Sequence, residues 1–170
     1  MKKILVSLIL VLASGFSLHA QVKYGITGGY VNMTEIAKSG SYKESYSVSA
    51  GVIGLFAEFQ SSDKLYIQPE LKYQVGFDAV DFLQIPVVVK YYLTDQFNVQ
   101  AGPQLSIVTE SIGGGFTNKN FGLIGGVGLS ISDSFQTNLR YSYQLNDHET
   151  SSTDFSDKIH FLSINMEFAF

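Results

Sequence analysis

The sequence predicts an all-β fold in which eight antiparallel strands close into an up-and-down barrel that crosses a membrane. Large apolar residues alternate with small or polar residues along most of the chain, and no 3.6-residue period is sustained. The expected strands exceed the roughly 9 to 11 residues that a tilted strand needs to cross a bilayer. Short and long connections alternate, as they do in transmembrane barrels.

The N-terminus has the features of a secretory signal peptide. Lys2 and Lys3 precede an apolar run over residues 4–12 and a stretch of small and polar residues over 13–20. The apolar run is shorter than the roughly 20 residues of a spanning helix. We expect a signal peptide over residues 1–20 and one barrel domain over residues 21–170. The alternative is a buried N-terminal helix in a cytoplasmic protein.

Composition excludes several classes of protein. Removing Lys2 and Lys3 takes the formal charge from −4 to −6, because no acidic residue precedes Gln21. A surface for nucleic acid is therefore not expected. The absence of cysteine excludes disulfides and thiolate metal sites. Charged residues make up 15% of the chain, against about 25% in soluble domains, which favours a crowded barrel interior over a sheet in water.

The strands and connections follow from the alternation and from clusters of Gly, Asn, Asp and Ser. The long connections are expected at 32–46, 111–118 and 146–157, and both termini on the side of the short turns. The expected strands cover residues 21–32, 47–60, 64–76, 81–93, 96–110, 119–131, 134–146 and 158–170.

The two faces of each strand differ in chemistry. On residues 134–146 the apolar face carries Leu139 and Tyr141, whereas the other face carries Asn138 and Arg140. With the apolar face toward lipid, the lumen receives a mixed set of charges that we expect to pair as a structural polar network, because an unpaired charge in a narrow interior is costly. This predicted luminal network comprises Glu58, Glu70, Lys72, Lys90, Arg140 and Glu167.

Aromatic residues on the apolar parity predict interfacial girdles at both rims. At the second rim we expect Tyr30, Tyr73, Phe121 and Tyr143. The girdle at the rim of the short turns comprises Tyr24, Phe59, Tyr91, Phe97, Phe135, Phe168 and Phe170.

Three prolines conflict locally with these strands. Pro69, Pro86 and Pro103 each lack a ladder donor, and proline in a sheet normally lies at an edge or a bulge. We therefore expect bulges near them, which could shift the inward and outward register by one residue.

Several stretches resemble a known family. Residues 162–170 alternate up to a terminal Phe170, which resembles the closing strand of bacterial outer-membrane barrels. Residues 66–73, 82–93, 101–105 and 121–128 look like the small porin-family outer-membrane barrel domain, of OmpA/OmpX-type eight-stranded architecture. The resemblance spans essentially all of the chain after residue 20.

The resemblance implies a location in the bacterial outer membrane, among its lipid and lipopolysaccharide. It also implies recognition by the barrel-assembly machinery through the C-terminal strand ending in Phe170. One departure is Gln84, where the family pattern has an acidic residue, so an ion pair between that position and Lys90 is not expected.

We expect a non-enzymatic barrel with a largely plugged lumen, outward-facing loops and no cofactor or metal. Its role would be structural, surface interaction or limited passage of small solutes, because a wide pore needs about 16 strands. A lipid A-modifying enzyme is one alternative, with His160 beside serines at 151, 152 and 163, although no G-x-S-x-G motif is present. A secreted soluble barrel for a hydrophobic ligand is another. Asp147, His148, Glu149, Asp154 and Asp157 form a weak cation-site candidate.

Overall fold

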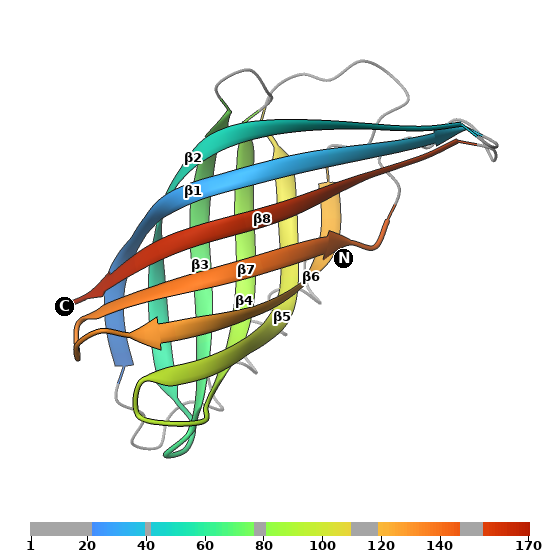
Figure 1. Ribbon diagram of the computed structural model, residues 1–170. Helices are drawn as coiled ribbons and strands as arrows, with labels where there is room; N and C mark the ends of the chain where they lie inside the picture. Colours follow the sequence, from blue (N-terminus) through green and yellow to red (C-terminus); the bar gives the residue numbers. More distant parts are fainter. Residues whose placement is uncertain (1–21, 40–41, 77–80, 110–118, 147–154) are drawn as a thin grey trace, which may run out of the picture.

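The chain folds into one closed β-barrel (Figure 1). The computed structural model describes residues 22–39, 42–76, 81–109, 119–146 and 155–170. Successive strands pair antiparallel in chain order, and β1 also pairs with β8, which confirms the predicted eight-stranded antiparallel barrel. The strands are β1 (Val22–Ser39), β2 (Tyr42–Gln60), β3 (Leu65–Gly76), β4 (Phe82–Tyr92), β5 (Phe97–Val108), β6 (Lys119–Ser130), β7 (Phe135–Gln144) and β8 (Phe155–Ala169).

Several predictions fall outside these residues. The signal peptide, the long connection at 111–118 and residues 147–154 of the last long connection are among them. Within the described part of the chain, no helix is long and apolar enough to span a membrane.

The barrel closes through the last residues of the chain. The register of β1 with β8 runs without a break from Gly25 opposite Ala169 to Ser39 opposite Phe155. Beyond the last strand residue, the Phe170 amide donates a hydrogen bond to the Tyr24 carbonyl at 2.8 Å. The first and last strands therefore satisfy each other's backbone groups, as a sheet in lipid requires.

The expected long loop over residues 32–46 is wrong, because most of it belongs to strands. β1 and β2 pair from Val22 opposite Phe59 as far as Ser39 opposite Tyr42. Thr34, which lies in this range, pairs across the strands with Ser47, and their hydroxyl oxygens are 2.9 Å apart. Together β1, β2 and β8 extend beyond the other five strands as a projecting sheet (Figure 1).

The bulges expected at the prolines are also wrong. Ladder pairs are interrupted beside each proline, but the register is the same on both sides of the gap. Between β3 and β4, Gln68 lies opposite Val88 before the gap and Lys72 lies opposite Gln84 after it, so no residue is inserted. The same holds beside Pro103 in β5 and on the β2 side of Pro69. The inward and outward assignments therefore hold through all three prolines.

Apolar side chains face out and polar side chains face in. On β7 and β8, Leu139 and Ile164 are 45% and 53% exposed, whereas the next residues on the other face, Asn138 and Asn165, are 2% and 1% exposed. The same alternation runs along β4, β5 and β6. A barrel dissolved in water would have the opposite arrangement, so the soluble-barrel alternative is wrong.

Candidate functional site in the barrel lumen

The structure places all six predicted luminal charges inside the barrel. They come from five strands: Glu58 from β2, Glu70 and Lys72 from β3, Lys90 from β4, Arg140 from β7 and Glu167 from β8. None of these residues is more than 8% exposed, and Lys90 is fully buried. Strand alternation alone directs them inward, because each lies on the parity opposite to the apolar face.

The six side chains form one continuous chain of ion pairs. Acids and bases alternate along it, so the three carboxylates and three cations balance. Its order is Glu58 to Lys90 at 2.8 Å, Lys90 to Glu167 at 3.0 Å, Glu167 to Arg140 at 2.9 Å, Arg140 to Glu70 at 2.7 Å and Glu70 to Lys72 at 2.6 Å.

Two of these ion pairs cross the full width of the lumen. In a closed ring of eight strands, β4 lies opposite β8 and β3 lies opposite β7. Lys90 and Glu167 join the first two strands, and Arg140 and Glu70 join the second two. At this level the lumen is filled by side chains in direct contact, as expected for a barrel of this size.

Four amide side chains that are not part of the predicted luminal network surround the charges. Each lies on the inward-facing side of its strand, so the alternation along the sequence indicates that it points into the lumen. The contacts are Gln100 Oε1 with Arg140 Nε at 2.6 Å, Gln136 Oε1 with Lys90 Nζ at 3.0 Å, Asn138 Nδ2 with Glu167 at 2.8 Å, and Gln68 Nε2 with Glu70 at 2.7 Å and Glu167 at 3.1 Å.

A second, apolar layer fills the lumen toward the other end of the barrel. The rings of Phe82 on β4 and Phe161 on β8 meet edge to face with centroids 5.5 Å apart, which again joins opposite strands. This layer was not predicted, because a polar lumen was expected. It consists of Val31, Met33, Val48, Ala50, Phe82, Val108, Ile159 and Phe161.

A small cavity of about 10 Å³ lies between the two layers. Lys72 and Arg140 border it on the charged side and Val31 and Phe161 on the apolar side. It is also lined by Asn165, whose Oδ1 is buried with no hydrogen-bond partner among the described residues. A cavity of this volume has room for about one water molecule.

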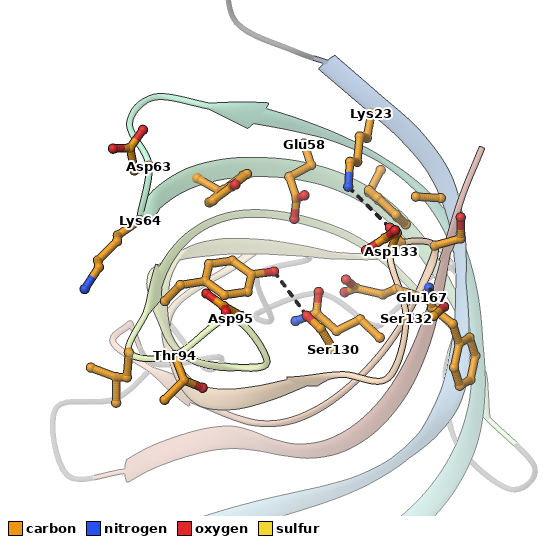
Figure 2. Close-up of a pocket in the computed structure, with 18 residues that line it drawn as sticks. Lys23, Glu58, Asp63, Lys64, Thr94, Asp95, Ser130, Ser132, Asp133 and Glu167 are labelled. Carbon is orange, nitrogen blue, oxygen red and sulfur yellow. Dashed lines mark hydrogen bonds between the residues drawn. The ribbon is translucent and has the colours of Figure 1, made fainter.

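At the end of the short turns the lumen opens into a bowl of about 460 Å³ (Figure 2). Glu58 and Glu167 belong to its lining and so connect it to the charge network. Around them stand residues of the turns, among them Lys64, Asp95 and Asp133 (Figure 2). This open cavity therefore leads from the short-turn end of the barrel to the charge network.

The seven residues of the predicted girdle lie on the outward parity near the short-turn ends of their strands. Tyr24 is 62% exposed and Phe170 is 78% exposed, and Phe135 lies opposite Phe168 on the next strand. Of the four residues expected at the second rim, Tyr73, Phe121 and Tyr143 lie near the opposite ends of their strands and are at least 40% exposed. Tyr30 is 49% exposed but lies in the middle of β1, opposite Ile164, so its expected place at that rim is wrong.

His160 lies on the outward parity of β8 beneath two tyrosines. Its Nδ1 is 3.0 Å from the Tyr141 hydroxyl, and its ring centroid is 4.9 Å from that of Tyr143. Ser163 lies on the inward parity, where its hydroxyl accepts from Asn165. His160 and Ser163 thus occupy opposite faces of the sheet; Ser151 and Ser152 fall outside the described residues.

The side chains of the cation-site candidate lie outside the described part of the structure. Residues 147–154 lie outside it, and of Asp157 only the backbone is described. No cluster of three His, Cys, Asp or Glu side chains suited to a metal ion occurs among the described residues.

An apolar outer belt and a closed, internally paired sheet define a transmembrane β-barrel. The chain belongs to the outer membrane protein beta-barrel domain family, whose model matches residues 8–170. It is accordingly a protein of the bacterial outer membrane, and the predicted location is confirmed.

Solved structures of other outer-membrane barrels are similar to this fold. Neisserial surface protein A is 14% identical, with a TM-score of 0.52, and the match covers 85% of this chain and 97% of that one. The attachment invasion locus protein of Yersinia pestis is 13% identical, with a TM-score of 0.47 and coverage of 88% and 99%. OprG from Pseudomonas aeruginosa is 16% identical, with a TM-score of 0.45 and coverage of 89% and 97%. Comparison with curated proteins gave no match.

Proposed function

We propose that this protein is a non-enzymatic outer-membrane barrel that conducts no steady ion current. The filled lumen has a structural role. The protein acts through its external surface, which comprises the loops and the projecting sheet of β1, β2 and β8. Two ion pairs that cross the lumen, Lys90 to Glu167 and Arg140 to Glu70, are the main support for this proposal. The contact between Phe82 and Phe161 closes the lumen at a second level.

Conductance in a planar bilayer tests the plugged lumen. We expect the wild-type barrel to give no large, steady channels, because any ion would have to displace paired charges and then an apolar layer. The reference with an open lumen is a variant in which the long side chains of both layers are truncated. It combines Lys90→Ala, Arg140→Ala, Phe82→Ala and Phe161→Ala. Large, steady channels from the wild type would contradict the proposal and favour a solute pathway.

The absence of enzymatic activity is part of the proposal. Among the described residues, the imidazole of His160 is engaged by Tyr141 and Tyr143 on the outer face, whereas the Ser163 hydroxyl lies on the inner parity. A nucleophile and its base must lie within hydrogen-bond reach of each other. This arrangement supports an interfacial aromatic cluster over a hydrolase or acyltransferase site.

We also propose that the barrel-assembly machinery recognises the C-terminal strand through Phe170. Deleting Phe170 removes its hydrogen bond to Tyr24 and its ring contact with Phe168, whose centroid is 5.9 Å away. We expect a several-fold loss of folded barrel in the outer membrane, measured by heat-modifiable gel mobility of membrane fractions. Phe97→Ala removes another ring of the same girdle as a control. An equal loss in both variants would indicate a general aromatic effect and not recognition of the terminal strand.

A further inference from the structure

The outer surface carries a groove that the barrel fold does not require. It has a volume of about 680 Å³ and crosses β8, β1, β2 and β3, which lie side by side in the sheet. Its lining is almost entirely apolar and includes Ile26, Ile53, Leu71, Met166 and Phe168. The volume lies within the range of about 300–1,000 Å³ that is usual for small-molecule sites.

The floor of the groove is Gly28. This residue lies between Ile53 on β2 and Met166 on β8, which are 67% and 59% exposed and stand on either side of it. A Cβ added at Gly28 would have only the Val52 carbonyl oxygen within 4 Å, at 3.6 Å, which is ordinary van der Waals contact. Glycine is therefore not needed here for close backbone packing, and its effect is to leave open space on the lipid side.

We propose that this groove binds one acyl chain of a membrane phospholipid and retains it more tightly than the surrounding lipid. The groove is continuous with the apolar belt that meets the membrane, and it reaches Phe135 and Phe168 in the girdle at the short-turn rim. A void in this position would forfeit dispersion contacts along its walls. A thin, flexible chain can fill a concave groove, whereas a second barrel would present a convex wall to it.

Native mass spectrometry tests the site on the intact barrel. The protein is reconstituted in vesicles of phosphatidylethanolamine and phosphatidylglycerol, extracted in mild detergent and examined for retained lipid. The test variant is Gly28→Phe, which fills the groove. The matched control is Gly125→Phe, because Gly125 also faces outward and a Cβ there meets no heavy atom within 4 Å.

The expected result is one phospholipid retained by the wild type and by Gly125→Phe, with a several-fold loss in Gly28→Phe. Gel mobility verifies that each variant is folded. Should Gly28→Phe not fold, Ile53→Ala with Met166→Ala lowers both walls of the groove and should give the same loss. A wild type without retained lipid, equal retention in the groove variants, or a lipid-free dimer that Gly28→Phe converts to monomer would overturn the proposal; the last outcome would identify a second copy as the occupant.

Discussion

Replacing Arg140 with methionine should lower the free energy of unfolding by about 3–5 kcal/mol, the cost of removing one partner from a buried ion pair. Arg140 donates to Glu70 at 2.7 Å and to Glu167 at 2.9 Å, and it is 3% exposed. Methionine preserves much of the side-chain volume but leaves two buried carboxylates with one cation fewer. The measurement is urea unfolding in lipid vesicles, followed by circular dichroism and gel mobility.

The control for Arg140→Met is Lys72→Met at the end of the chain of ion pairs. Lys72 contacts one carboxylate of the network, Glu70, whereas Arg140 joins two. We expect the smaller loss for Lys72→Met and a partial recovery when Arg140→Met is combined with Glu70→Gln and Glu167→Gln. Unfolding of Arg140→Met at the wild-type urea concentration would show that the network contributes no net stability.

The balance of the network explains why its members act together. Lys90 is fully buried and contacts both Glu58 and Glu167, with Gln136 as a third acceptor. Every single charge removal therefore leaves a net charge inside a narrow interior of low polarity. Removing the charges in complementary sets should cost less than the sum of the single changes, because neighbours in one network are not additive.

Strand alternation alone was sufficient to predict much of this architecture. A period of two fixes which side of the sheet each residue occupies, so Arg140 on β7 and Glu167 on β8 were placed on one face without knowledge of their partners. What alternation does not contain is the pairing across the lumen. Contact between Lys90 and Glu167 depends on the number of strands and on the stagger of the sheet, which the closed barrel supplies.

Two features of the structure were not predicted, because their residue types are typical of a different environment. Met33 and Phe161 are apolar on the inward parity, and a polar lumen was expected, yet a narrow barrel is packed like any core once water is excluded. Thr34 was assigned to a long connection, but it lies in β1, where its hydroxyl pairs with that of Ser47 on β2. In both places the pairing of neighbouring strands decided the structure, and composition misled.

Replacing Ile164 with arginine should destabilise the barrel by about 2–4 kcal/mol, the cost of a basic side chain on the lipid face near the bilayer midplane. Ile164 is 53% exposed, lies between Tyr30 on β1 and Leu139 on β7, and is several residues from the girdle at Phe168. The loss is measured by the same urea titration in vesicles, where the free energy of unfolding reports the transfer of the side chain into lipid.

The depth of the substituted residue in the bilayer determines the expected loss of stability. Leu129 is 46% exposed on the same outer surface but lies opposite Phe97 at the short-turn rim, so Leu129→Arg should cost only about 0–1 kcal/mol, because arginine near the interface reaches water and headgroups. A soluble sheet would tolerate arginine equally at both exposed positions. A large loss at Ile164 together with a small loss at Leu129 is therefore expected only if the apolar belt meets hydrocarbon, and equal small losses would mean that it does not.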